Sequence, residues 1–374
     1  MYRGGAVIHN WWKVWAALLV LGAAGGVLAQ GPGDPYGFTE SFAAPPGLDE
    51  SVVRGQQPVA QPDVPGYGIA EAPVGDPQWA VHGEFLYLRP GNDKVAFAVP
   101  INGAIAPPAG APPVQVGPEV LVDLGFSPGF RVGGEWAYSP CSALGADFTW
   151  FEGNRTNSAV GSAAFPLRSL VNHPGSLSTA SDSLDATARS QIDFQLADVF
   201  YRRTLVRDET SFVNLVGSVR YAHLGEEFRS TFTSSATVET VNTDITFDGV
   251  GVRLGLEAEQ ETCRPGLLVY GKGYASILGG QFSSRYAQAD SARGDVVTTG
   301  WTEDRAISIL ETEFGLGWVS RCGGLRITGG YMFNGWFNVI NTDDFIRAVR
   351  KLDSVNVRDS LTFDGLVFRA ETRF

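Results

Sequence analysis

The side chains in this sequence that could carry out chemistry are few and scattered. Four histidines and three cysteines occur in 374 residues. His82, His173 and His223 stand in no motif that pairs a base with a nucleophile, and His9 lies in the apolar N-terminal run. A general base needs a nucleophile or carboxylate within hydrogen-bond reach. We therefore expect no enzymatic activity.

The cysteines Cys141, Cys263 and Cys322 each lie in a short stretch rich in turn-forming residues. No CxxC spacing and no paired histidines accompany them, so we expect neither a metal site nor a cofactor. If the chain is exported, they meet an oxidising compartment. One disulfide and one free thiol are compatible with this count, and the spacing does not decide which two would pair.

Charged residues recur at every second position in several stretches. One residue separates Glu257 from Glu259 and Glu311 from Glu313, and apolar residues such as Leu256, Ala258, Leu310 and Phe314 lie beside them. Side chains alternate between the two faces of a strand. Such stretches are strands with one charged face and one apolar face.

The same pattern closes the chain in RDSLTFDGLVFRAETRF, residues 358–374. Leu366, Phe368 and Phe374 share a face with Ala370 and Thr372, opposite Arg369, Glu371 and Arg373. A final strand ending on Phe374, with Phe368 on the same face, resembles the closing strand of bacterial outer-membrane barrels, where the terminal aromatic residue is an assembly signal. The apolar face would meet lipid and the charged face a wet lumen.

The charges on the inward faces are the candidate functional residues. We expect them to be Glu84, Arg131, Glu135, Asp147, Asp193, Arg220, Arg253, Glu257, Lys272, Glu311, Glu313, Arg326, Arg369 and Glu371. Rings of such charges set ion selectivity in pores. Alternatively, they pair into salt bridges that fill the interior, since a barrel of about eight strands is filled by its own side chains and ten is only slightly wider.

The connections between strands alternate in length from Trp79 onward. Short turns are expected near 140, 208, 263 and 322, and long connections near 105, 170, 236, 295 and 347. Residues 226–246 form either a loop or the upper parts of two strands, 153–188 and 287–304 form polar loops, and 338–357 has helical propensity. This meander predicts about ten strands, within roughly 8–12.

The predicted fold class is all-β: a single transmembrane antiparallel β-barrel with short periplasmic turns and long extracellular loops. A soluble β-sandwich is the alternative. Two features disfavour the sandwich. Several strands carry charges on one face, and the opposite apolar faces together leave few other residues to cover them. A membrane helix bundle would need several apolar runs of about 18 residues or more, and only the N-terminus has one.

Three segments divide the chain. Residues 1–29 read as a signal peptide, with Arg3 and Lys13 before an apolar run and small residues before Gln30; an uncleaved anchor helix is the alternative. Residues 30–78 are a Pro/Gly-rich leader without periodicity. Residues 79–374 form the barrel. The formal net charge of −12 disfavours nucleic acid as a partner.

Several stretches carry a family likeness. GEFLYLRPGNDKVAFAV (83–99), SPGFRVGGEWAYSPCSALGADFTWF (127–151), DFQLADVFYRR (193–203) and VYGKGYASILGGQF (269–282) resemble the pore-forming outer-membrane proteins grouped with the Legionella major outer membrane protein. A planctomycete β-barrel porin family shares the general layout. The resemblance spans most of 79–374 and implies an outer-membrane barrel that forms a pore, without catalytic residues.

The expected function is therefore passive passage of small solutes or ions across a bacterial outer membrane. The alternative is a structural or surface-interaction barrel with a plugged lumen, in which the long loops 89–126 and 153–188 do the work. The expected partners are outer-membrane lipid and the barrel-assembly machinery. Nothing in the sequence demands an oligomer.

Overall fold

The structure is a computed structural model that describes residues 78–374 apart from 104–112, 175–181, 209, 235–236 and 354–356. The expected signal peptide (1–29) and leader (30–78, up to residue 77) lie outside the described residues. Within the described part of the chain, no helix is long and apolar enough to cross a membrane.

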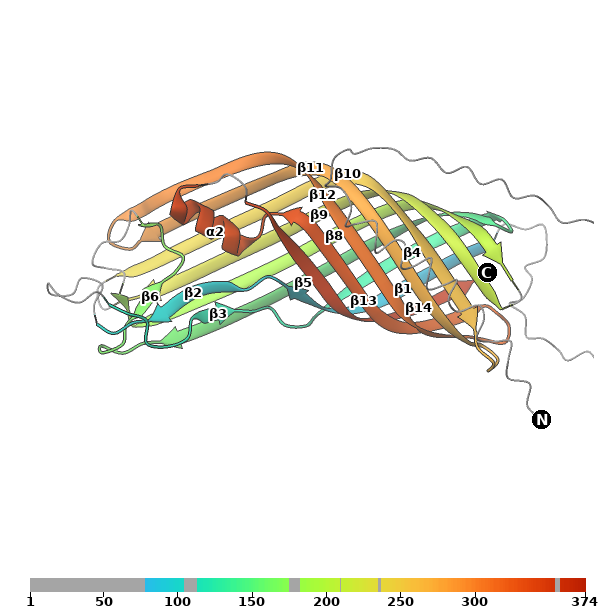
Figure 1. Ribbon diagram of the computed structural model, residues 1–374, viewed down its shortest axis with the longest axis horizontal. Helices are drawn as coiled ribbons and strands as arrows, with labels where there is room; N and C mark the ends of the chain where they lie inside the picture. The colour runs from blue at the N-terminus through green and yellow to red at the C-terminus, as the bar shows by residue number, and fades with distance from the viewer. Residues whose placement is uncertain (1–77, 104–112, 175–181, 209, 235–236, 354–356) are drawn as a thin grey trace, which may run out of the picture. The chain divides into compact units, whose positions relative to one another are not determined.

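Ten antiparallel strands close into a barrel, which confirms the predicted fold class and strand number (Figure 1). They are β1 (Gln78–Gly91), β4 (Ser127–Ser139), β5 (Ser142–Val160), β8 (Asp185–Arg207), β9 (Ser211–Thr233), β10 (Val238–Glu261), β11 (Leu267–Asp290), β12 (Gly294–Val319), β13 (Leu325–Val339) and β14 (Asp359–Arg373). Their order around the barrel is β1-β14-β13-β12-β11-β10-β9-β8-β5-β4, and β4 pairs with β1 to close it.

The first and last strands meet at the end of the barrel that carries the short turns. The amides and carbonyls of Trp79 and Phe374 exchange two hydrogen bonds of 2.9 Å. Short connections join β4 to β5, β8 to β9, β10 to β11 and β12 to β13 at this end, where the sequence predicts them. We call it the turn end and the opposite one the loop end.

The strands differ in length around the barrel. β8 to β12 have 23 to 26 residues, whereas β1, β4, β13 and β14 have 13 to 15. One wall therefore reaches further towards the loop end than the other (Figure 1). Of the two interpretations of 226–246, the strand interpretation holds, since β9 and β10 run through most of it.

Two predicted loops are partly wrong. Residues 287–304 are mostly strand, because β11 continues to Asp290 and β12 begins at Gly294. Likewise, β5 continues to Val160 and β8 begins at Asp185, which shortens the loop predicted at 153–188. These stretches are predicted as loops because they are polar. They are strands because polar side chains also suit a strand whose outer face meets water.

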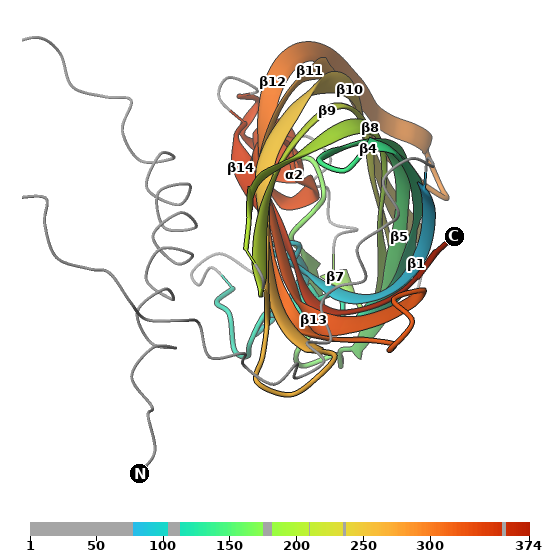
Figure 2. The same ribbon diagram turned by 90° about the vertical axis from the view of Figure 1, so that its right-hand side faces the viewer.

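Smaller elements fill the barrel above the short wall. A four-stranded sheet in the order β3-β2-β6-β7 combines β2 (Val95–Pro100), β3 (Val120–Val122), β6 (Leu167–Ser169) and β7 (Asp182–Ser183). Helix α2 (Thr342–Lys351) follows β13, in the segment with predicted helical propensity. Figure 2 shows α2 within the ring of strands.

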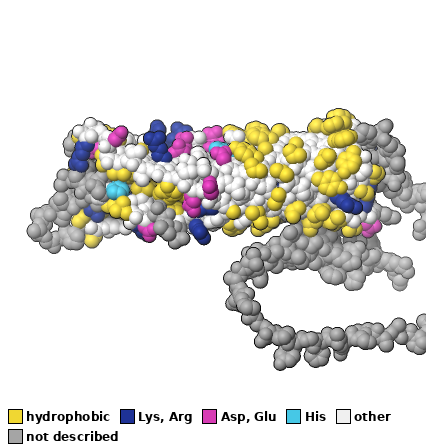
Figure 3. Space-filling view, turned by 90° about the horizontal axis from the view of Figure 1, so that it is seen from above, with side chains coloured by type: hydrophobic (Ala, Val, Ile, Leu, Met, Phe, Trp, Pro, Cys, Tyr) yellow, Lys and Arg dark blue, Asp and Glu magenta, His cyan; other side chains and the backbone are white. Residues whose placement is uncertain are grey.

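The outer surface has one apolar half and one polar half. Exposed large apolar side chains, among them Val219, Val252, Leu254 and Phe314, cover the half at the turn end. Figure 3 shows hydrophobic side chains gathered over one half of this face and most of the charged side chains over the other. We call the first half the apolar band, and it has the character of a lipid-facing surface.

The band ends between two neighbouring rows of outward residues. Ala197, Tyr221 and Val250 lie opposite one another on β8, β9 and β10 in its last row. The next row towards the loop end is polar, with Gln195, His223 and Asp248. Beyond it, the strands stand clear of the lipid-facing surface.

Candidate functional site

The inward faces of the strands within the apolar band carry charges that pair across the barrel. Arg220 on β9 binds Asp198 on β8 through two bonds of 2.8 Å, from Nε to Oδ1 and from Nη2 to Oδ2. Its Nη1 lies 2.8 Å from Oε2 of Glu311 on β12, three strands away. Arg253 joins this group, with Nε 3.2 Å from the same Glu311 oxygen. The side chains of Arg220, Asp198 and Glu311 are 1%, 4% and 5% exposed.

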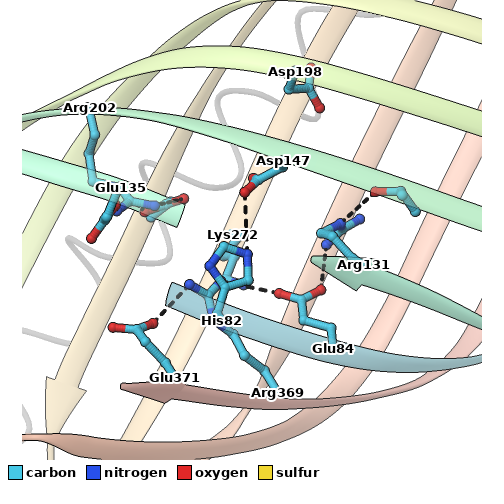
Figure 4. A network of polar contacts seen from close by, with 12 residues as sticks. His82, Glu84, Arg131, Glu135, Asp147, Asp198, Arg202, Lys272, Arg369 and Glu371 are labelled. Carbon is cyan, nitrogen blue, oxygen red and sulfur yellow. Dashed lines mark hydrogen bonds and ion pairs between the residues drawn. The ribbon is translucent and has the colours of Figure 1, made fainter. Parts of the chain in front are cut away.

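A second group surrounds Glu84 on β1 (Figure 4). Its Oε2 lies 2.8 Å from Nη1 of Arg131 on β4, and its Oε1 lies 3.1 Å from Nη1 of Arg369 on β14. Lys272 on β11 pairs with Glu313 on β12 at 3.0 Å. Arg131 also approaches Glu313 to 3.9 Å. Since β4 and β12 lie on nearly opposite walls, this contact spans the lumen.

A third group lies nearer the turn end. Arg202 on β8 contacts Glu135 on β4 and lies 2.9 Å from Oε2 of Glu257 on β10. Arg326 on β13 pairs with Glu259 on β10. Glu371 accepts from both Arg369 and Arg373 at 2.8 Å. The contacts of Arg202 and Arg326 join strands that are not neighbours in the sheet, whereas Glu371 is bound by two arginines of its own strand.

One histidine lies among these charges. His82 Nε2 is 3.3 Å from Oδ1 of Asp147 (Figure 4). Gly133 makes room for the pair, because a Cβ there would lie 2.0 Å from that Asp147 oxygen. No group of three or more histidine, cysteine or acidic side chains among the described residues has the geometry to hold a metal ion.

The structure places all but one of the predicted inward charges in these groups. Asp193 is the exception, and its prediction is wrong. It lies on the outer face beside His223, with its Oδ2 3.9 Å from Nε2, while its chain neighbours Ile192 and Phe194 are buried in the core.

The misplacement of Asp193 reflects an inversion of the two faces. Within the band, polar residues point inward and apolar residues outward; beyond it, the inward residues of β8, such as Ile192 and Phe194, are apolar. The alternation changes phase at Leu196 and Ala197, two successive apolar residues. Because of the same phase change, the period-two pattern before Leu196 does not predict Asp198 and Arg202 as inward residues, and the break at Leu196 and Ala197 is the sequence signal that marks them.

A layer of aromatic rings lies inside the barrel above the ion pairs. Phe194 on β8 lies 4.7 Å from Phe363 on β14 and 6.0 Å from Trp336 on β13, ring centroid to ring centroid. Phe151 on β5 lies 5.3 Å from Phe194 and 5.5 Å from Phe363. All four side chains are fully buried. Because they come from opposite walls, they form a continuous apolar layer across the barrel.

Above this layer, the connections that fold inward form an apolar filling, which we call the plug. It consists of α2, β2, β3 and the segment 167–173. Phe97, Val122, Val171 and Phe345 from these elements lie in one core cluster with inward residues of the tall wall, including Phe228, Ile245, Phe282 and Tyr286. Phe345 also packs on Trp301 of β12, with the ring centroids 4.5 Å apart.

Two buried carboxylates tie the plug to the tall wall. Glu226 on β9 accepts hydrogen bonds through Oε2 from the amide (2.9 Å) and the hydroxyl (2.7 Å) of Thr342, at the start of α2. Glu239 on β10 accepts from the side-chain amides of Asn172 and Gln288. Both acids lie beyond the polar row that ends the apolar band, and burial raises the pKa of each above its ordinary value.

The three cysteines lie where the sequence predicts them. Cys141, Cys263 and Cys322 are exposed in the connections of the turn end. None of them forms a disulfide in the structure.

The chain matches a protein family in sequence and resembles several solved structures distantly. The model of the Legionella pneumophila major outer membrane protein precursor family matches residues 71–374. Among solved structures, the outer membrane protease OmpT from Escherichia coli shares 10% identity, with 79% of this chain and 97% of that chain covered and a TM-score of 0.44. A mutant of the monoaromatic hydrocarbon channel TodX shares 8% identity over 81% and 91%, with a TM-score of 0.27.

A Pseudomonas aeruginosa FadL homologue also shares 8% identity, over 80% of this chain and 89% of that chain, with a TM-score of 0.21. No curated protein matches the chain in sequence. At these identities and TM-scores, the activities of the solved proteins are not transferred to this chain. The family match, in contrast, spans the whole barrel. The chain belongs to the Legionella pneumophila major outer membrane protein family and is an outer-membrane β-barrel.

Proposed function

We propose that this protein is a closed outer-membrane barrel with a structural or surface-interaction role, and that it is not an open pore. One observation carries the proposal: the charged residues of the lumen are buried and paired across it. A water-filled path would leave them hydrated and exposed. Instead, the side chains of Arg131 and Glu84 are 11% and 0% exposed.

The two barriers along the lumen support this proposal. Several of the ion pairs, such as Arg220 with Glu311 and Arg202 with Glu135, join strands that are not neighbours, so they cross the interior of a barrel of ten strands. The aromatic layer and the plug then exclude water from the half towards the loop end. Neither barrier depends on the other, and an ion would have to pass both.

Planar-bilayer recording of the purified full-length barrel tests the proposal. We expect a silent bilayer from protein whose folding is verified by circular dichroism and by its heat-dependent gel mobility. Discrete, salt-dependent conductance steps from the unmodified protein would overturn it.

A pore for small solutes or ions is the second candidate. The observation in its favour is that the lumen within the band is lined by charged side chains, whose rearrangement would leave a polar path. If steps occur, Glu311→Ala with Glu313→Ala should shift the reversal potential, whereas Asp193→Ala on the outer face should not.

The remaining parts of the proposal concern topology and partners. We place the turn end in the periplasm and the loop end outside the cell, as in other bacterial barrels. The chain would be exported by a signal peptide cleaved before Gln30, and Phe374 would be read by the barrel-assembly machinery. Outer-membrane lipid would surround the apolar band. We propose no enzymatic activity.

A further inference from the structure

Helix α2 is held in the barrel at its N-terminus by an acid from the opposite wall. Glu226 on β9 accepts hydrogen bonds from the amide and the hydroxyl of Thr342. Helix α2 itself follows β13, which is four strands away from β9 in the barrel. An amide at a helix N-terminus has no partner within the helix. Glu226 therefore supplies from the wall a bond that α2 cannot make for itself.

The Glu226 carboxylate lacks a cationic partner. Among the residues that the structure describes, no lysine or arginine lies within ion-pair distance of it. Its second oxygen, Oε1, is buried and accepts no hydrogen bond from any described residue. A buried charge without a counter-charge is costly. Two hydrogen bonds to Thr342 therefore favour docking of α2, while the burial of an ionised Glu226 opposes it.

The surrounding groups are mostly acidic. Asp93, in the connection after β1, and Asp359, on β14, both raise the cost of a charge on Glu226. The other charged groups facing this region are Asp343 and Asp344 of α2, Arg347, which pairs with Asp343 at 2.6 Å, Lys351, Glu119 and Arg89. Arg89 lies 3.4 Å from Asp123 and favours the charged form of Asp93.

The segment that carries α2 is bounded by two residues with left-handed backbone. Asn338 (φ +66°) precedes it and Leu352 (φ +56°) ends it, both in the left-handed region that non-glycine residues seldom adopt. Between them, α2 presents Phe345, Ile346 and Val349 to the core. The far end is held by Arg350, which donates to the Leu170 carbonyl.

We propose that α2 is a strap whose docking inside the barrel is released when Glu226 ionises. Release would uncover the apolar inner face of the tall wall at the loop end. The strap is therefore closed in acid and opens as the pH rises. The proposal concerns docking, so it holds whether or not the barrel conducts ions.

The electrostatics set the direction of the effect. Burial is the main cause that raises the pKa of Glu226 from its ordinary 4.5 to about 7. Asp93, also buried, has its pKa raised to about 6. Undocked, Glu226 meets water and recovers its ordinary pKa. The docked state binds the extra proton, so docking is strongest below pH 4.5 and is weakened as the pH rises through 7.

Thiol accessibility on the full-length protein tests the strap. In a background with Cys141→Ser, Cys263→Ser and Cys322→Ser, Ala348→Cys places a thiol on the buried face of α2, and Leu352→Cys places one at an exposed position of the same segment. The rate of labelling by a charged maleimide at the first site, divided by that at the second, cancels the pH dependence of the thiol itself.

We expect this ratio to rise on the order of tenfold between pH 5.5 and 8.5. Glu226→Gln keeps an oxygen acceptor for Thr342 but cannot ionise, so the rise should shrink severalfold; adding Asp93→Asn should abolish it. Thr342→Val, which removes only the hydroxyl donor, should raise the ratio at every pH. A flat ratio in the unmodified background, or an undiminished rise with Glu226→Gln, would overturn the proposal.

Discussion

Single residues in the interior act through partners on distant strands. Arg220 illustrates this, because its guanidinium joins Asp198 on the neighbouring strand to Glu311 three strands away. Neither acid has a cation of its own strand within reach. The geometry of one side chain thus connects two walls.

Removing that guanidinium should therefore destabilise the barrel strongly. Arg220→Ala leaves two buried carboxylates with only Arg253 to share, and breaking a buried pair costs about 3–5 kcal/mol. Arg189→Ala, which removes an exposed outward arginine from β8, should change the free energy of unfolding by less than about 0.5 kcal/mol. Urea unfolding in lipid vesicles measures both, and equal losses would contradict this view of the interior.

At the scale of elements, α2 is stabilised by its flanking residues as well as by its apolar face. Asn341 caps it by accepting a 2.9 Å hydrogen bond from the Asp344 amide, and it also binds Asp359. Acids occupy its first turn and bases its last, an arrangement that suits the helix dipole. The Asn341 cap therefore stabilises α2 against local opening more than it stabilises the barrel against unfolding.

Asn341→Ala should loosen α2 alone. Loss of an N-cap costs about 1 kcal/mol, which corresponds to roughly fivefold faster hydrogen exchange for amides of α2 if they exchange by local opening. Amides of β9 to β12 should be unaffected. Lys351→Ala, at the other end of α2, is the matched control and should have little effect. Faster exchange throughout the barrel would show that α2 does not open independently.

At the scale of the whole molecule, two halves with opposite polarity are stacked along one barrel. The half at the turn end is apolar outside and charged inside, and the half at the loop end is polar outside and apolar inside. The first arrangement suits lipid and the second suits water. This stacking is what allows β9 to β12 to extend beyond the membrane.

The proposed orientation can be checked on intact cells. An epitope inserted after Ala292, in the turn between β11 and β12, should be detected by antibody without permeabilisation, since that turn lies at the loop end. The same epitope after Gly323, between β12 and β13, should be detected only after the outer membrane is opened. Detection in the reverse order would invert the topology and place the strap in the periplasm.

The sequence by itself determined the class of fold. Alternating faces, alternating connection lengths and an aromatic C-terminal residue depend on local chemistry, and they predicted ten strands, the four tight turns and the helical propensity after Phe337. The charged face of each strand within the band could also be predicted, as Glu311 and Glu313 show, because period-two alternation needs no knowledge of neighbours.

Only the tertiary structure decided what the inward charges do. Whether Glu311 lines a water path or binds Arg220 depends on distances across the lumen, which no strand encodes alone. Asp193 is a related case, because the period-two pattern is the same for a lipid-facing and a water-facing strand. The strand alone shows a break at Leu196 and Ala197, but not on which side of it the interior is apolar; the packing of distant segments such as Phe97 and Phe345 decides that. Glu226 carried no signal at all, because its role depends on a helix more than a hundred residues later in the chain.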